Sequence, residues 1–451
     1  MRRFPKQINP GRLLVFYYLT IIIIGTFFLL LPISSKNLSP IDALFTSTSA
    51  VCVTGLVVRD VATDFTFLGK IIILILIQIG GIGYMTLSTA FFFFLGQKIS
   101  LRDRLLVKEQ FNFFSYENLR RFAFTVLRVT VTIEGMGAIL LFCYFYFKSQ
   151  MSLSLAIGHA IFHSVSAFCN AGFSTFSDNL GNFPQNYFVP IVMSLLIISG
   201  GIGFIVISDI YKRYITHKNR QVSLHTKTVL TTTGLLIFIG TLLILFLEWP
   251  SAFNGLPIGY KLLNAYFYAV TPRTAGFSTL SVAGFRLATQ LLIMILMFIG
   301  ASSGGTGGGI KTTTFSILLL ELRALLTGQQ ELLIYNRRVS QAQTFKAFLI
   351  IGLAITYLLI SLFLLLIFNH ANINFITNAF ELISAFGTVG LSLGSKIMPQ
   401  LSASYDFTII GKIIIILTML VGRVGILTVS TALIRKRLIR YTQPEGVILI
   451  G

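Results

Sequence analysis

Long apolar runs alternate with short polar segments along the whole chain. A helix needs about 20 apolar residues to cross a bilayer core, and eight runs come close to that length or exceed it. They form four pairs: Leu13–Ile33 with Leu68–Leu95, Phe122–Phe147 with Phe188–Ile210, Val229–Leu247 with Leu291–Leu320, and Ala347–Phe368 with Phe407–Leu433. The pattern predicts an all-α integral membrane protein with eight transmembrane helices.

A semi-apolar stretch, too short to cross the bilayer, lies between the two runs of each pair. The four stretches are Ile41–Val51, Leu155–Phe168, Tyr260–Val270 and Phe375–Phe386. Helices of this length suit re-entrant segments, and irregular backbone at membrane depth is tolerated only where protein buries it or water reaches it. We therefore expect four re-entrant pore helices that converge on one axis.

Each short stretch leads into a similar segment centred on one glycine. The segments read SAVCVTGLV, SAFCNAGFS, AVTPRTAGFS and SAFGTVGLS. Their spacing of roughly 110 residues indicates four copies of one membrane–pore–membrane (M1-P-M2) unit in pseudo-fourfold arrangement. One glycine alone could serve only a tight turn or close helix packing, whereas the fourfold repeat favours a pore.

A K⁺ filter replaces the hydration shell of the ion with backbone carbonyls of a TVGYG loop. Glycine reaches the left-handed angles that such a loop needs without steric cost. The pentapeptide that begins at Thr388 reads TVGLS and matches the first three positions. We predict that K⁺ binds the backbone carbonyls of the following residues: Val53, Thr54, Gly55, Asn170, Ala171, Gly172, Thr274, Ala275, Gly276, Thr388, Val389 and Gly390.

Charge adds an orientation to this picture. The chain has 35 Lys and Arg against 15 Asp and Glu, a net charge of +20. The basic residues form short clusters between the repeats, which is typical of cytoplasmic loops and argues against a nucleic-acid partner. We expect both termini in the cytoplasm and the glycine segments facing outward. The three cysteines predict no disulfide framework.

These observations divide the chain into nine segments. The predicted ranges are a cytoplasmic N-terminus at 1–12, repeat one at 13–97, a cytoplasmic loop at 98–121, repeat two at 122–211, a loop at 212–228, repeat three at 229–325, a loop at 326–346, repeat four at 347–433 and a cytoplasmic C-terminus at 434–451.

The four glycine segments within their repeats resemble the Trk/Ktr/HKT superfamily of potassium transporters, and within it the KtrB-type subunits. The resemblance covers nearly the whole chain. It implies a K⁺-conducting homodimer in the bacterial cytoplasmic membrane, in contact with membrane lipids and with a cytosolic, nucleotide-binding RCK-type (KtrA-like) subunit. In that superfamily a serine at the first filter glycine accompanies Na⁺ permeation, so Gly55 favours K⁺. Sodium remains a second candidate ion, and we expect no organic cofactor and no enzyme activity.

The second run of repeat three contains six glycines and three hydroxyl residues between Gly300 and Gly309. A glycine costs about 1 kcal/mol relative to alanine inside a helix, so we expect a loop at 300–310. Broken helices at membrane depth mark a cavity or site. The resemblance implies an intramembrane gating loop, with gating residues Gly304, Gly305, Thr306, Gly307, Gly308, Gly309 and Lys311. A nucleotide P-loop is disfavoured because Ile310 separates Gly309 from the lysine and no strand precedes it.

Arg423 is a charge inside an apolar run, and intramembrane charges mark function by default. The resemblance places it beside the gating loop, where it could repel cations or hold the loop shut. A snorkelling or paired structural arginine is the alternative, with Glu134 as a candidate partner.

Five further residues attract attention in or beside the pore helices: Asp42, His159, His163, Arg273 and Glu381. The two histidines lack the glutamate of a zinc-protease motif, so we expect structural roles for them. Arg273 could tie its filter segment to neighbouring helices or repel cations at the mouth, and the two acids could shape the field there. Two other functions stay open, a secondary transporter of another small solute and a membrane-embedded enzyme.

Overall fold

The computed structural model describes residues 10–83, 119–214, 221–329, 331–370 and 372–433. Each predicted first run forms a helix long and apolar enough to cross a membrane. These helices are α1 (Pro10–Leu30), α6 (Leu119–Cys143, continued by the π turn η1 at Tyr144–Lys148), α10 (Leu224–Glu248) and α14 (Gln341–Phe368).

The four short stretches form the predicted pore helices, and every bound lies within two residues of its expected position. They are α2 (Pro40–Val51), α7 (Leu153–Phe168), α11 (Ile258–Val270) and α15 (Phe375–Gly387). The first residues of α2 show why the helix begins where it does. Ser39 caps the helix by accepting a hydrogen bond from the backbone N–H of Asp42, and Pro40 occupies the first helical position, where its missing N–H costs nothing.

The second runs are interrupted, not only in repeat three, where a loop was expected, but also in repeats two and four. In repeats two and four the helices bend by 97° and 102°. Gly203 and Gly425 stand at these breaks with φ of +94° and +93°, angles that end a right-handed helix. The second-run helices are α3 (Phe67–Ile82), α8 (Phe188–Gly201), α9 (Phe204–Tyr214), α12 (Leu287–Phe298), α13 (Thr312–Leu326), α16 (Ile409–Val424) and α17 (Ile426–Leu433).

Repeat three breaks where the glycine content predicts it, between Phe298 and Thr312. In repeat one α3 ends at Ile82, and the rest of the predicted run, 84–95, lies outside the described residues. So do most of the predicted N-terminus, residues 98–118 of the predicted loop at 98–121, and the whole C-terminus at 434–451.

Glycines just before the breaks allow the second helices to abut the pore helices. A Cβ atom on Gly80, Gly200 or Gly422 would collide with a carbonyl oxygen at the end of the pore helix in the same repeat. The carbonyls belong to Val51, Phe168 and Phe386 respectively. These small residues therefore let the second helices pack closely on the pore helices.

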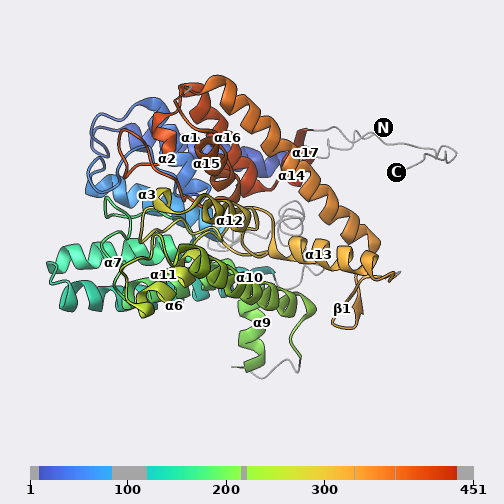
Figure 1. Cartoon of the computed structure of the whole chain (residues 1–451). Coiled ribbons are helices and arrows are strands. Elements are labelled where there is room, and N and C mark those ends of the chain that lie inside the picture. Colours follow the sequence, from blue (N-terminus) through green and yellow to red (C-terminus); the bar gives the residue numbers. More distant parts are fainter. Residues whose placement is uncertain (1–9, 84–118, 215–220, 330, 371, 434–451) are drawn as a thin grey trace.

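The four repeats surround a common centre. Repeats one and four lie on one side of it and repeats two and three on the other (Figure 1). Contacts between α2 and α16, α3 and α7, α8 and α11, and α12 and α15 close the circle. The remaining described elements are two single turns, η2 (Val282–Gly284) and η3 (Ala403–Asp406), and a hairpin of β1 (Leu333–Ile334) with β2 (Arg337–Arg338).

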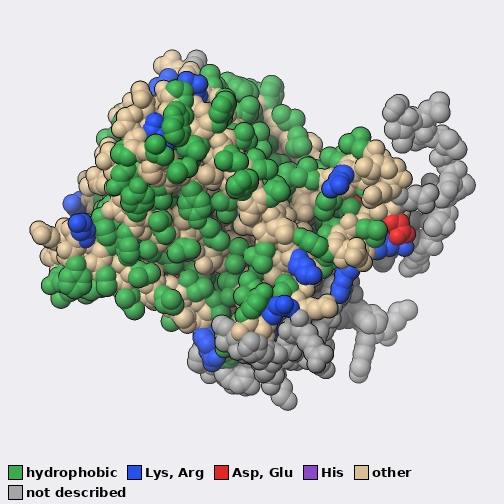
Figure 2. All heavy atoms as spheres, turned by 60° about the horizontal axis from the view of Figure 1, so that its bottom comes forward, with side chains coloured by type: hydrophobic (Ala, Val, Ile, Leu, Met, Phe, Trp, Pro, Cys, Tyr) green, Lys and Arg blue, Asp and Glu red, His purple; other side chains and the backbone are tan. Residues whose placement is uncertain are grey.

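The outer surface of the molecule is apolar. Figure 2 shows hydrophobic side chains over most of the face in view, with Lys and Arg in only a few places. Phe16, Phe246 and Phe363 expose 71%, 79% and 65% of their surface. An apolar surface this extensive suits contact with lipid.

Candidate ion pathway

The four filter glycines form a closed ring at the centre of the molecule. A Cβ atom on each would meet the carbonyl oxygen that precedes the glycine of the next repeat: Gly55 meets Ala171, Gly172 meets Ala275, Gly276 meets Val389, and Gly390 meets Thr54. The glycines have φ between +72° and +89°. Four segments far apart in the sequence are thus in contact, with one backbone conformation.

A second ring of left-handed residues lies two positions before the glycines. Val53, Asn170, Thr274 and Thr388 have φ of +56°, +60°, +77° and +49°. Asparagine tolerates this region, but a β-branched residue there is a true outlier. Such strain persists only where the surroundings impose it, and it gathers at functional sites. Left-handed angles were expected of glycine alone, so these positions could not be predicted from the sequence.

One hydroxyl from each pore-helix end fixes the adjacent filter backbone. Ser49 accepts a hydrogen bond from the N–H of Gly55 at 3.0 Å and donates to the carbonyl of Leu56 at 2.8 Å. Ser384 accepts from Gly390 at 3.1 Å. Ser166 and Thr271 donate to Phe173 and Phe277, both at 2.7 Å. The available sequence signal was the Ser that opens segments one, two and four and the Thr at the third position of segment three.

The outer ends of the filter segments are held in two alternating ways, seen at the residue two positions after each glycine. Val57 and Ser278 pair with the preceding repeat: Val57 donates to Ser402 at 2.8 Å, and Leu180 donates to Ser278 at 3.0 Å. Ser174 and Ser392, in contrast, bond within their own repeats. Repeats one and three are thus held by the preceding repeat, and repeats two and four by their own residues.

The pore helices of repeats two and four supply that internal bracing. The Nε2 atom of His163 lies 3.0 Å from the hydroxyl of Ser174, and Phe176 stacks on both predicted histidines. Glu381 accepts a hydrogen bond from the hydroxyl of Ser392 at 2.7 Å and is completely buried. The histidines thus have the structural role expected of them, and Glu381 supports the filter from behind rather than facing the mouth.

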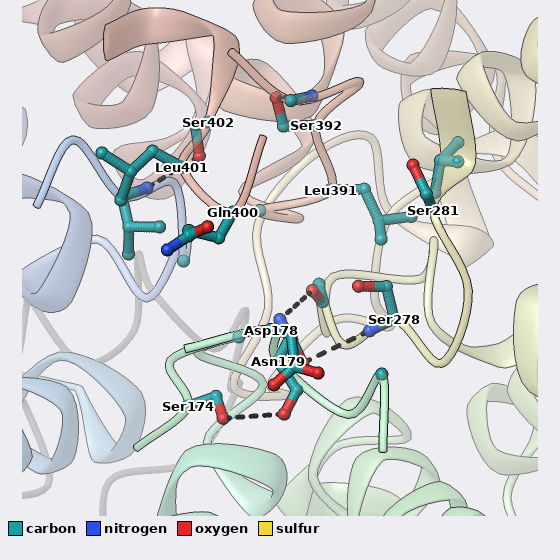
Figure 3. Close-up of a pocket in the computed structure, with 18 of the residues that line it drawn as sticks. Ser174, Asp178, Asn179, Ser278, Ser281, Leu391, Ser392, Gln400, Leu401 and Ser402 are labelled. Carbon is teal, nitrogen blue, oxygen red and sulfur yellow. Dashed lines mark hydrogen bonds between the residues drawn. The ribbon is translucent and has the colours of Figure 1, made fainter. Parts of the chain in front are cut away.

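An open cavity of about 520 Å³ lies on the outer side of the glycine ring. All four filter glycines line it, together with Asp60. Figure 3 shows the serine-rich loops around it, with Asp178 and Asn179 between Ser174 and Ser278. The serine-rich loops give this opening to the ring a polar lining.

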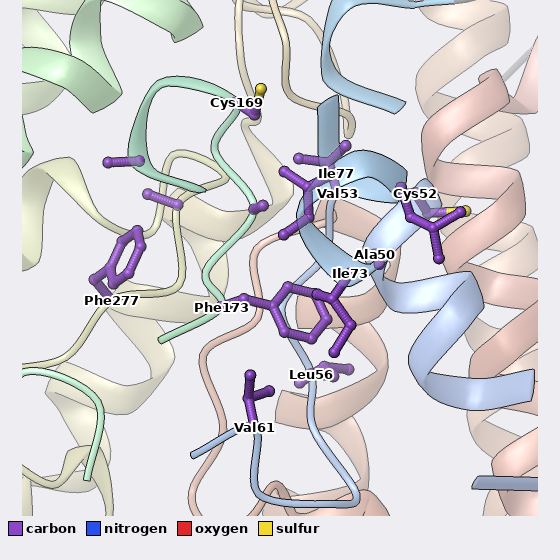
Figure 4. Packing of buried hydrophobic residues seen from close by; sticks show 14 of the residues in the cluster. Ala50, Cys52, Val53, Leu56, Val61, Ile73, Ile77, Cys169, Phe173 and Phe277 are labelled. Carbon is purple, nitrogen blue, oxygen red and sulfur yellow. The ribbon is translucent and has the colours of Figure 1, made fainter. Parts of the chain in front are cut away.

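The filter segments rest on a rigid apolar layer. Val53, Leu56 and Phe173 are completely buried in one cluster with Ile73 and Ile77 of α3 (Figure 4). Close-packed side chains of this kind have low compressibility. The layer therefore resists movement of the filter segments that pack against it.

The loop between α12 and α13 crosses beneath the ring. Its Gly308 N–H donates to the hydroxyl of Thr388 at 2.8 Å. Thr306 donates through its N–H to the carbonyl of Gly200 at 3.2 Å, and through its hydroxyl to the carbonyl of Phe168. Gly307 packs so closely on the Thr274 hydroxyl that a Cβ atom would collide with it. The loop thus packs against the residues that precede the ring glycines, on the side away from the 520 Å³ cavity.

Two cations hold successive carbonyls of this loop. Arg423 donates to the carbonyls of Thr306 and Gly80, and Lys311 donates to the carbonyl of Gly307 at 2.7 Å. Both side chains line an inner cavity of about 150 Å³, together with Gly304, Gly305 and Gly307. Arg423 therefore joins the loop to α3.

The suggested pairing of Arg423 with Glu134 does not occur. Glu134 accepts a hydrogen bond from Gln78 at 3.0 Å and lies 3.7 Å from the sulfur of Cys169. Backbone carbonyls, which a search for opposite charges overlooks, are the partners of Arg423 instead.

Arg273 ties its filter segment to a neighbouring helix. The side chain is 6% exposed and donates to the hydroxyl of Thr233 on α10 at 3.3 Å. It is not among the residues that line the outer cavity. The alternative that it repels cations at the mouth is therefore not supported.

Asp42 forms two ion pairs, one within repeat one and one that connects it to repeat four. Its carboxylate lies 2.9 Å from both Arg59 and Lys412, and its side chain is 6% exposed.

We expect Asp42→Ala to lower the free energy of unfolding by about 3 kcal/mol, because removing one partner leaves a buried charge unpaired. Thermal unfolding in detergent measures this. Glu331→Ala, which breaks the exposed pair with Arg338, is the matched control and should change the midpoint little. Equal midpoints for both variants would contradict the expectation.

The described helices, the central ring and the apolar exterior define a multi-pass membrane protein with the M1-P-M2 repeat architecture. The family described as "TrkH: Cation transport protein" matches residues 10–438. The chain belongs to this family of cation transport proteins, which agrees with the expectation of a non-enzyme.

Three similar proteins cover almost the full chain. The chain is 39% identical to the Ktr system potassium uptake protein B of Bacillus subtilis, over 99% of this chain and 97% of that one. It is 36% identical to the potassium/sodium uptake protein NtpJ of Enterococcus hirae, over 100% and 99%. The crystal structure of the potassium transporter TrkH from Vibrio parahaemolyticus matches with a TM-score of 0.75 at 19% identity, over 96% of this chain and 86% of that chain. The last match concerns the fold.

Proposed function

We propose that the chain takes up K⁺ across the cytoplasmic membrane, through a selectivity filter built from the four glycine segments. The closed ring of Gly55, Gly172, Gly276 and Gly390 carries this proposal. Rings of backbone carbonyls select K⁺ by replacing its water, and the relatives from Bacillus subtilis and Enterococcus hirae are named for potassium and for potassium/sodium uptake. Na⁺ is accordingly the second ion to test.

The membrane potential supplies the driving force in this proposal. One elementary charge gains about 2.3 kcal/mol per 100 mV, so inward K⁺ movement needs no chemical step in the chain. The glycine segments face outward, and both termini and the loops between repeats lie in the cytoplasm. The ranges predicted for the repeats and loops belong to this proposal.

The loop at 300–310 is the gate in this proposal. Its contacts with Thr388 and Thr274 obstruct the inner end of the filter, and Arg423 and Lys311 hold it there. Opening then requires the loop to leave Arg423. Assembly as a homodimer with a cytosolic nucleotide-binding RCK-type subunit gives a source for that movement, in keeping with the word "system" in the names of the Ktr relatives.

Cation flux into proteoliposomes tests the proposal. With the purified chain reconstituted and the interior made negative, we expect ⁸⁶Rb⁺ uptake that external K⁺ inhibits and that exceeds ²²Na⁺ uptake. Collapsing the potential should stop it. No cation uptake above protein-free vesicles, from protein that remains monodisperse in detergent, would contradict the proposal and leave a transporter of another solute as the better candidate.

A further inference from the structure

The four glycine carbonyls of the ring are not equivalent. In the parts of the chain that the structure describes, only the carbonyl of Gly276 accepts a side-chain hydrogen bond. The donor is the amide nitrogen of Asn179, at 3.4 Å, from the outer loop of repeat two. One carbonyl in the filter is therefore shared between the ion path and a protein donor.

Asn179 holds filter segment three at two points. Its amide oxygen accepts a hydrogen bond from the N–H of Ser278 at 3.4 Å, while its amide nitrogen donates to Gly276. The next residue, Leu180, donates to the carbonyl of Ser278 at 3.0 Å. Figure 3 shows the Asn179 side chain between the loops of repeats two and three. The carboxamide thus pairs with the segment as a neighbouring strand would.

The position of Asn179 is itself fixed by repeat two. Its backbone carbonyl accepts a hydrogen bond from the hydroxyl of Ser174 at 3.1 Å, and Ser174 lies 3.0 Å from His163 on pore helix α7. Asn179 has a φ of +60°, a left-handed angle that asparagine adopts more readily than most residues. We call the two contacts of the Asn179 carboxamide with Gly276 and Ser278 the clamp. The residue that makes them is connected through Ser174 and His163 to pore helix α7.

We propose that Asn179 is a positioning residue for ion selectivity, which holds the Gly276 carbonyl back from the ion path. This inference rests on the proposed function. Selectivity depends on the number and field strength of the carbonyl dipoles around the ion and on their freedom to move. A carbonyl released from Asn179 gains freedom to approach the axis and to coordinate the smaller Na⁺. Loss of the clamp therefore lowers the preference for Rb⁺ over Na⁺.

Two substitutions remove the contact of Asn179 with Gly276 while preserving the local backbone or the size of the side chain. Asn179→Gly removes the carboxamide and keeps the left-handed backbone accessible. Asn179→Asp keeps the size and the acceptor for Ser278 but replaces the donor to Gly276 with a second acceptor. Asn182 lies in the same loop and is exposed, and its amide donates to Asp178 at 3.4 Å. Asn182→Gly and Asn182→Asp are thus matched controls for backbone freedom and for added charge.

The readout is the ratio of ⁸⁶Rb⁺ to ²²Na⁺ uptake in proteoliposomes. We expect this ratio to fall at least threefold in both Asn179 variants and to stay within experimental error of the parent chain in both Asn182 variants. A purely structural role would lower both fluxes together and leave the ratio unchanged, which would overturn the inference. So would an equal fall in the Asn182→Asp control, because charge at the mouth would then be the cause. If the parent chain carries no Rb⁺, the proposed function fails, whereas an unchanged ratio in an active parent overturns only the role of Asn179.

Discussion

Gly390→Ala is expected to reduce K⁺-inhibited ⁸⁶Rb⁺ uptake to the level of protein-free vesicles. Gly390 has a φ of +89°, where an L side chain is strained. The new Cβ atom would also collide with the carbonyl oxygen of Thr54 and lie 2.9 Å from the backbone of Gly55. Because each glycine touches the next repeat, one methyl group displaces two of the four filter walls.

Gly352→Ala is the matched control for this substitution. Gly352 lies in α14 with open space where a Cβ atom would be, and alanine favours a helix. This variant should transport as the parent chain does. Gel filtration in detergent must show that Gly390→Ala remains folded. Normal uptake by a folded Gly390→Ala protein would refute a conducting role for the ring.

Arg423→Ala is expected to raise uptake by the isolated chain about tenfold. The substitution removes the two hydrogen bonds that join the loop carbonyl of Thr306 to Gly80 of α3. Hydrogen bonds to a charged group contribute about 1.5 to 3 kcal/mol, and tenfold in an equilibrium corresponds to about 1.4 kcal/mol. Loss of even one such bond is thus enough to shift the loop toward the open state by that factor. Initial rates of ⁸⁶Rb⁺ uptake measure the effect.

Two further variants decide how Arg423 acts. Arg423→Gln keeps hydrogen-bond donors but removes the charge, so it should retain part of the restraint if the bonds matter and behave as alanine if charge repulsion dominates. Arg128→Ala removes a cation from an exposed position on α6 and should leave the rate unchanged. A lower rate in Arg423→Ala, with the fold intact, would show that the arginine supports the open path rather than the closed loop.

The pore helices and the filter glycines could be predicted because their signals are local. Apolar length separates spans from short helices, and the recurrence around Gly55, Gly172, Gly276 and Gly390 is visible in one sequence. The hinges at Gly203 and Gly425 had the same kind of signal, in the repeated GGIG and GRVG motifs, but close packing explains a glycine as well as a bend does. The positive φ values show that both glycines end a helix at a bend, and these angles cannot be obtained from the sequence.

Contacts between repeats were beyond the sequence. Asn179 and Gly276 are 97 residues apart, and nothing in either neighbourhood indicates the other. Opposite charges suggested Glu134 for Arg423, yet Arg423 bonds to carbonyls that every residue possesses. The left-handed backbone of Val53 could not be predicted from its residue type, because β-branched residues ordinarily avoid that region. Tertiary packing overrides local preference at these positions.

A single polypeptide supplies every wall of the ring, and this has a genetic consequence. In a pore assembled from identical subunits, one codon change is copied into all sides at once. Here one codon change alters the residue in only one of the four repeats. The four residues at the left-handed positions before the glycines, Val53, Asn170, Thr274 and Thr388, already include three residue types. Differences at these four positions can therefore arise in one repeat at a time.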